Sequence, residues 1–154
     1  MSNESGIFKI TNPDLILRMI PLIEEYVSIV KGPGIYASAA TTFFVQTVAS
    51  GMNSAEIWAA YQNDGIVGFA RWQTLSLPYL SDVVCDALYL SGKPTFKLVT
   101  ELMGQFVNFG IAMKAKRYHT QIYDSKVNRV ITKILGRKGV KMVDASFHYS
   151  VGGF

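Results

Sequence analysis

The chain has 154 residues, of which 49% are hydrophobic and 17% charged, and its net charge is +4. This composition excludes a disordered chain and suits one domain, residues 1–154, around one core. No apolar run reaches the ~18 residues of a membrane helix, no signal-peptide pattern opens the chain and one cysteine excludes an internal disulfide, so we expect a cytoplasmic protein that contacts no membrane.

The N-terminal third is predicted to contain one strand and two helices. The strand is expected at residues 6–10. A helix follows an Asn-Pro-Asp start signal and carries an apolar stripe over 14–30, and Pro21 is expected to kink or divide it. A second helix is expected over 37–50, with Gly51 closing its C-terminus.

The middle of the chain contains the clearest β-hairpin. Its strands are expected at residues 56–62 and 66–74, and they flank the turn Asn63-Asp64-Gly65. We expect the glycine to supply the positive φ that such a turn requires. Residues 75–81 are expected to form a loop before the next strand.

Residues 82–139 are predicted to form a strand, a glycine-containing turn, a long helix, a strand and a helix. A strand that runs through such a turn into a helix N-terminus is a common anion site, because the first helical N–H groups lack partners. The whole order is β-α-α-β-β-β-α-β-α-β, a mixed sheet flanked by helices. The expected elements are strand 82–90, helix 95–113, strand 117–123, helix 126–138 and strand 141–151.

This order resembles the GNAT-type N-acetyltransferases, and four local features carry the likeness. The hairpin around Asn63-Asp64-Gly65 looks like the family's second and third strands. Strand 82–90 with its turn and helix looks like the acetyl-CoA site, and strand 118–123 looks like its splayed neighbour. Five residues match the spacing of the family's C-terminal motif: Asn128, Ile131, Leu135, Gly139 and Val140.

The resemblance implies a GNAT-like α/β fold and transfer of an acetyl group from acetyl-CoA to an amine by direct attack. Strand amides near Tyr89 and Leu90 would bind the pantetheine, and the turn with the helix start would hold the pyrophosphate. The candidate contacts with the cofactor are Tyr89, Leu90, Ser91, Lys93, Thr95, Phe96, Lys97 and Asn128.

Two residues are candidates for proton transfer. An attacking amine must lose a proton, and Asp86 is placed where the family often has its base. Strand alternation predicts that Asp86 shares a face with Leu88 and Leu90; the alternative is a structural, hydrogen-bonded aspartate. Tyr123 is the candidate proton donor to the leaving thiolate, the alternative being a core or surface tyrosine.

The sequence also departs from the family's pattern. The phosphate turn of the family is Arg/Gln-x-x-Gly-x-Gly/Ala, and here it reads Gly92-Lys93-Pro94-Thr95-Phe96-Lys97. Leu135 stands where the family often has a catalytic tyrosine. Eroded turns of this kind resemble those of small GNAT-like proteins of tailed phages. The alternative function is therefore a catalytically eroded binding or structural module, for instance a virion-associated one.

A basic stripe is predicted on the last helix. Arg129, Lys133 and Arg137 recur at every fourth residue, with Lys126 and Lys138 beside them. The stripe is either a solvated helix face or a docking surface for an anionic partner, either nucleic acid or an acidic protein. The basic C-terminal part favours such a partner, because residues 93–154 contain eleven Lys/Arg and three Asp/Glu against four and eight in residues 1–92.

The remaining polar residues are assigned structural roles. We expect no metal site, because His119 and His148 lack the spacing of metal ligands and only one cysteine is present. Asp82 is expected to be a solvated start of its strand. Cys85 is expected to pack inward as a small apolar side chain.

Overall fold

A six-stranded sheet forms the centre of the computed structural model, in the order β1-β2-β3-β4-β5-β6. The strands β1 to β4 pair antiparallel, whereas β4, β5 and β6 run parallel. The strands are β1 (Ser5–Lys9), β2 (Ala55–Gln62), β3 (Gly65–Leu77), β4 (Leu80–Leu90), β5 (Arg117–Thr120) and β6 (Met142–Asp144). The structure describes residues 4–30, 37–51, 53–77, 80–92, 96–120, 125–140 and 142–144.

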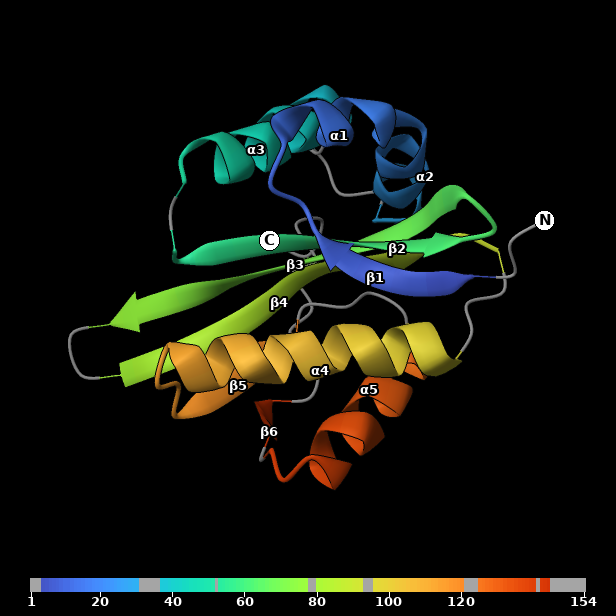
Figure 1. The fold of residues 1–154 in the computed structure, drawn as a ribbon. Coiled ribbons are helices and arrows are strands. Elements are labelled where there is room, and N and C mark those ends of the chain that lie inside the picture. Colours follow the sequence, from blue (N-terminus) through green and yellow to red (C-terminus); the bar gives the residue numbers. More distant parts are fainter. Residues whose placement is uncertain are drawn as a thin grey trace.

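Helices cover both faces of this sheet, as Figure 1 shows: α1, α2 and α3 lie over one face, and α4 and α5 lie over the other. Their bounds are α1 (Pro13–Arg18), α2 (Ile20–Val30), α3 (Ala37–Ala49), α4 (Phe96–Ala112) and α5 (Ser125–Arg137). The predicted mixed α/β fold is confirmed. Among the helices that the structure describes, none is long and apolar enough to cross a membrane.

Each face of the sheet has its own apolar cluster, because successive strand residues point to opposite sides. In β3, Trp72 is fully buried on the α4 side, where its ring lies 5.5 Å from that of Phe106. Phe69 points the other way and lies 5.5 Å from Phe44 of α3. The sheet is therefore buried on both faces, and β3 and β4 lie at its centre.

The first predicted helix is divided, as Pro21 suggested. The helix α1 ends at Arg18 and α2 begins at Ile20, so Pro21 occupies the first turn of α2, where its missing N–H is not needed. Asn12 caps α1 by accepting a hydrogen bond of 2.9 Å from the Asp14 amide. The division allows two short helices to lie across the sheet.

Two details of the hairpins differ from expectation. In the β2–β3 turn, Asn63 and Asp64 adopt the left-handed conformation, with φ of 51° and 68°, and Gly65 instead pairs with Gln62. The expected loop over 75–81 is wrong, because β3 continues to Leu77 and β4 starts at Leu80. The two strands pair out to Leu77 and Leu80, so only residues 78 and 79, which lie outside the described part of the chain, separate them.

Candidate active site

The site begins where β4 loses its described partner on one side. The strands β4 and β5 pair from Asp82–Arg117 to Cys85–Thr120. Beyond Cys85, β4 continues to Leu90 beside β3, and no described strand lies along its other edge. We call this edge of β4, along which the structure describes no strand, the open edge; it is at the position where the family resemblance implied a splayed neighbouring strand.

A β-bulge marks the same point. Arg71 of β3 pairs with Ala87, but the next residue, Trp72, pairs with Cys85, so Asp86 is the extra residue. A bulge changes the direction of side chains and interrupts strand alternation. The predicted common face of Asp86, Leu88 and Leu90 is therefore wrong: the leucines pack with the cluster under α4, and Asp86 lies under α3, paired with Arg71.

Arg71 connects this bulge to α3. Its side chain is only 4% exposed and forms an ion pair with Asp86. Its Nε and Nη2 donate hydrogen bonds of 3.3 Å to Thr47 Oγ1, and its guanidinium lies 4.2 Å from the centre of the Phe43 ring. Burial lowers the pKa of Arg71, and the ion pair with Asp86 opposes that shift.

The two carboxylate oxygens of Asp86 have different surroundings. Its Oδ2 accepts from Arg71, while its Oδ1 is buried without a hydrogen-bond partner among the described residues. Burial raises the pKa of Asp86 to about 6, although Arg71 acts in the opposite direction. A carboxyl group with a pKa near 6 is ionised at neutral pH and still able to retain a proton, as a general base requires.

The open edge also offers backbone groups. The Ser91 amide donates a hydrogen bond of 2.7 Å to the Val67 carbonyl, so at Ser91 the polar groups point toward β3. Successive residues of a strand direct their amide and carbonyl groups to opposite edges, so the amide and carbonyl of Leu90 and of Leu88 point toward the open edge. These groups can pair with an extended ligand laid along β4, such as a pantetheine arm.

Glu25 of α2 forms hydrogen bonds with two side chains at the end of β4. Its Oε2 accepts hydrogen bonds from the Tyr89 hydroxyl at 2.7 Å and from the Ser91 hydroxyl at 3.3 Å. Partial burial and the Glu25 carboxylate raise the pKa of Tyr89. The side chains of two predicted cofactor contacts are thus turned toward α2, on the same face of the sheet as Asp86.

The start of α4 holds two further candidates. Phe96 is its first residue, and its side chain is 57% exposed to solvent. Lys97 Nζ lies 3.3 Å from Ser5 Oγ and 3.8 Å from Glu101 Oε1, so it bridges α4 and β1. Three further candidates lie outside the described residues: Lys93, Thr95 and Tyr123. Asn128 lies in the first turn of α5, but its side chain is not among those that the structure describes.

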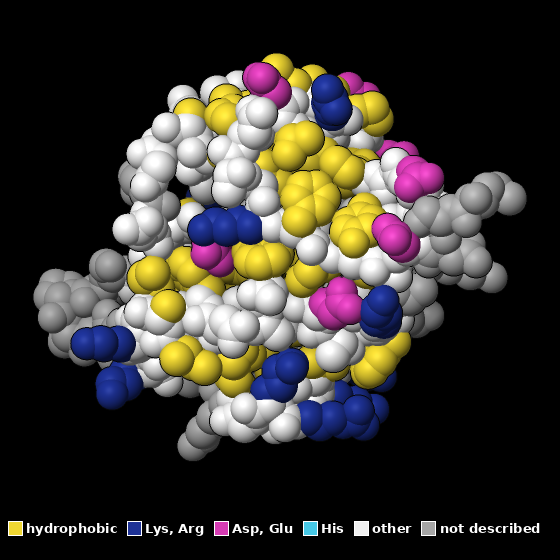
Figure 2. Space-filling view, in the orientation of Figure 1, with side chains coloured by type: hydrophobic (Ala, Val, Ile, Leu, Met, Phe, Trp, Pro, Cys, Tyr) yellow, Lys and Arg dark blue, Asp and Glu magenta, His cyan; other side chains and the backbone are white. Residues whose placement is uncertain are grey.

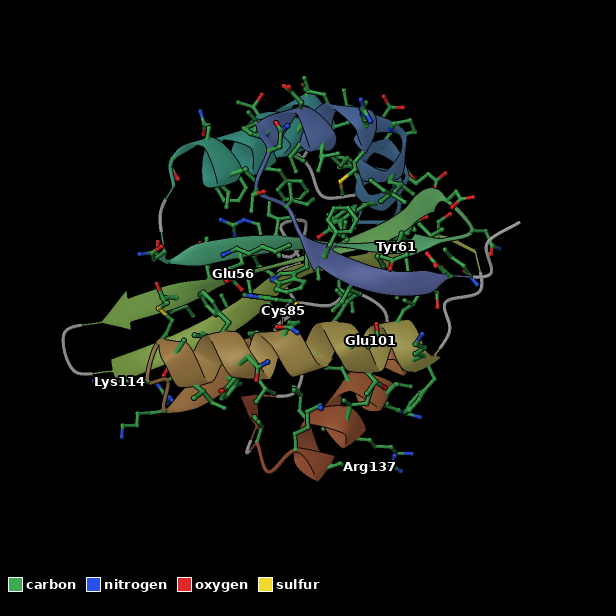
Figure 3. All side chains as sticks on the ribbon, viewed as in Figure 1. Glu56, Tyr61, Cys85, Glu101, Lys114 and Arg137 are labelled. Atoms are coloured by element: carbon green, nitrogen blue, oxygen red, sulfur yellow. The ribbon has the colours of Figure 1, made fainter. Side chains whose placement is uncertain are left out.

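The C-terminal helix divides as predicted into an inner and an outer face. Leu135 is fully buried and has no proton to donate, and Gly139 ends the helix region with φ of 79°. The inner residues are Ile131, Ile134 and Leu135, and the exposed ones are Arg129, Lys133, Arg137 and Lys138. Figure 3 shows Arg137 on the outer side of α5, and Figure 2 shows Lys and Arg gathered over the α4–α5 layer.

Asp82 anchors the paired end of β4 and β5. It is 4% exposed, so the expected solvated strand start is wrong. Arg117 donates to both of its oxygens, at 3.1 and 2.9 Å, and His119 Nε2 lies 2.9 Å from Oδ2. Burial alone would raise the pKa of Asp82, but the bonds from Arg117 and His119 lower it overall.

Cys85 lies between the sheet and α4 (Figure 3), fully buried as expected. Burial raises the pKa of its thiol strongly, which keeps it protonated and unreactive. Within the described part of the chain, no group of three His, Cys, Asp or Glu side chains is arranged to hold a metal ion. Of the two ionisable side chains at the point where the described pairing of β4 with β5 ends, Cys85 is thus inert and Asp86 remains the candidate for proton transfer.

Sequence reasoning overlooked Arg71, Thr47 and Glu25. The signal for Arg71 was present: it is a lone basic residue in a strand whose neighbours, Ala70 and Trp72, are apolar. A charge on a strand buried on both faces needs an acidic partner. Thr47 and Glu25 carried no comparable signal, because their contacts join residues 24 to 66 positions apart.

Comparison with known proteins places this geometry in context. No protein-family model matches the chain, and no curated protein matches it. Among solved structures, a predicted acetyltransferase with acetyl-CoA from Clostridium acetobutylicum matches with a TM-score of 0.70 and 12% identity, covering 98% of this chain and 99% of that chain.

Two further structures match over nearly the full length. An aminoglycoside N-acetyltransferase in complex with CoA has a TM-score of 0.68 and 11% identity, covering 97% of this chain and 95% of its own. A ribosomal-protein-alanine N-acetyltransferase from Brucella melitensis biovar Abortus has a TM-score of 0.65 and 14% identity, covering 95% and 98%. The chain therefore has the GNAT-type acetyltransferase fold.

Proposed function

We propose that this chain, on its GNAT-type fold, transfers an acetyl group from acetyl-CoA to an amine by direct attack. The observation that carries the proposal is the coincidence of two features at one point of β4. The strand loses its described partner after Cys85, and the bulge places at that point the Asp86 carboxylate, whose buried Oδ1 has no hydrogen-bond partner among the described residues. A thioester held along the open edge would meet a proton acceptor at its reacting end.

In this proposal the pantetheine pairs with the open-edge backbone groups of Leu88 and Leu90. The pyrophosphate lies at the N-terminus of α4, where the helix dipole favours an anion, with Lys93 and Thr95 as contacts. A strand amide polarises the thioester carbonyl. Binding of CoA by the Clostridium and aminoglycoside-modifying neighbours supports this part of the proposal.

The chemical step uses the chain's own proton carriers. The amine nitrogen attacks the thioester carbonyl carbon, and a C–N bond forms as the C–S bond breaks. The proton lost by nitrogen passes to Asp86 Oδ1, directly or through water. The departing thiolate takes a proton from Tyr123. Cys85 plays no part, because its thiol is buried and protonated.

Thermal unfolding with acetyl-CoA tests the proposal. At ~100 times its dissociation constant the ligand should add ~2.7 kcal/mol to the free energy of unfolding. In a chain of this size that raises Tm by roughly 5–10 °C. CoA should stabilise similarly, whereas ADP, which lacks pantetheine, should stabilise much less. No shift at millimolar acetyl-CoA would instead support the eroded, non-catalytic module.

We also propose that the outer face of α5 docks an anionic partner. Four exposed cations, Arg129, Lys133, Arg137 and Lys138, support this role, and Lys126 lies in the same helix. Like charges four residues apart repel by a few tenths of a kcal/mol. An anionic surface, either a nucleic acid or an acidic protein, would relieve that repulsion on binding.

A further inference from the structure

We infer that Thr47 and Phe43 of α3 are positioning residues for the proton acceptor Asp86, acting through Arg71. The inference rests on the proposed acyl transfer for its catalytic meaning, but the structural link stands on contacts. One turn of α3, from Phe43 to Thr47, supplies both groups that fix the Arg71 guanidinium on the side away from Asp86.

The first contact is a fork of hydrogen bonds. Thr47 Oγ1 accepts from Arg71 Nε and from Arg71 Nη2, both at 3.3 Å, and donates its own proton to the Phe43 carbonyl at 2.9 Å. A hydroxyl that is itself held by its helix is a fixed acceptor. The fork therefore sets the plane of the guanidinium and aims Nη1 at Asp86 Oδ2.

The second contact is the Phe43 ring, 4.2 Å from the guanidinium carbon. This geometry is a cation–π interaction, which gains strength when the cation is removed from water. Phe43 is itself 47% exposed, so its ring forms the wall between solvent and the nearly buried Arg71. An aliphatic side chain in place of the ring would still exclude water but would lose this contact, so the guanidinium would be held less firmly beside Asp86.

The pKa of Asp86 depends on how Arg71 is held. Arg71 is the charged group that acts on Asp86. The side chains of α3 that face this ion pair, Thr47 and Phe43, are neutral. The neutral Gln73 of β3 also lies near the pair, 3.4 Å from Arg71 Nη2. Arg71 lowers the pKa of Asp86 against the effect of burial. Any loosening of Arg71 should therefore move the Asp86 pKa further upward.

The test is an NMR titration of the Asp86 carboxyl in protein labelled with ¹³C-aspartate, with Asp86→Asn used to assign the signal. Thr47→Val should raise the Asp86 pKa by about half a unit or more, and Phe43→Leu should do the same. Thr41→Val is the matched control, because Thr41 also donates to the carbonyl four residues earlier, at 2.7 Å, on the same helix. It should leave the Asp86 pKa unchanged.

The outcomes separate this inference from the proposed function. If both α3 variants fold and titrate like Thr41→Val, then α3 does not position Asp86 and the inference is overturned. If the pKa moves but the wild type acetylates no amine from a broad panel, the structural link holds and the acyl transfer fails. If activity is found, the acid limb of its pH profile should move upward with the carboxyl titration in Thr47→Val.

Discussion

Tyr118 of β5 packs directly against Gly110 of α4, and its hydroxyl donates a hydrogen bond of 3.0 Å to the Val107 carbonyl. A Cβ placed on Gly110 would collide with the phenol ring. The missing side chain therefore lets α4 approach β5 closely, and this contact helps to fix β5 beside β4.

Gly110→Ala should accordingly destabilise the fold by about 1–3 kcal/mol, because the new methyl group overpacks the α4–β5 contact. Gly104→Ala is the matched control in the same helix. The nearest atom to its Cβ is the flexible Lys138 Nζ at 3.6 Å, so it should stabilise by up to about 1 kcal/mol through helix propensity. Urea unfolding measures both, and equal effects would contradict the close packing at Tyr118.

Sequence reasoning located α4 well because Leu98, Leu102 and Phe106 repeat at helical spacing and all three are fully buried. It located the C-terminal end of β4 at Leu90 for a similar reason, since Gly92 follows a run of β-branched and apolar residues. Local patterns of this kind predict the structure well, because the spacing of apolar residues within an element determines which of its faces packs against the core.

No local pattern predicted the bulge at Asp86. One inserted residue in a ladder leaves no trace in composition, yet it turned the carboxylate from the α4 face to the α3 face. The partners of Asp82 were missed for the related reason that Arg117 lies 35 residues away. Pairings across strands depend on register, which a single sequence does not display.

Asp82→Asn should cost about 2 kcal/mol at neutral pH, since it leaves Arg117 and His119 without their carboxylate. The pKa of Asp82 is lowered in the fold, so its stabilising contribution is present above the ordinary value near 3.9 and is lost as pH falls through the folded value. The stability difference between wild type and variant should therefore shrink below about pH 4. Urea unfolding at several pH values checks this, and a constant difference would refute the charged role.

The raised pKa of Asp86 predicts the opposite pH dependence of the free energy of unfolding. Its folded pKa, about 6, lies above the unfolded value, so protonation favours the fold and stability is lost as pH rises through 6. The proposed acyl transfer needs the ionised form of Asp86, so log kcat/KM for an amine that is acetylated should fall with unit slope below about pH 6. Asp86→Asn should lower kcat/KM by ~10²–10⁴ and remove that limb. An unchanged limb in the variant would assign the proton acceptor elsewhere.

The basic stripe of α5 makes a prediction that does not depend on catalysis. Replacing Arg129, Lys133 and Arg137 with Gln should leave the fold intact, because each is exposed and such changes cost within ~0.5 kcal/mol. If the stripe docks duplex DNA, log affinity should fall against log salt by about 0.9 per phosphate neutralised, so the triple variant should flatten the slope by up to about 2.7.

A control with the same change in net charge separates docking from general attraction. Arg18, Lys114 and Lys116 are exposed and lie outside α5, so their replacement by Gln should leave the salt slope near the wild-type value if the stripe is the contact. Equal flattening by both triple variants would reduce the effect to net charge. If the wild-type protein neither shifts DNA in a gel nor retains an acidic protein at low salt, the stripe is an ordinary solvated helix face.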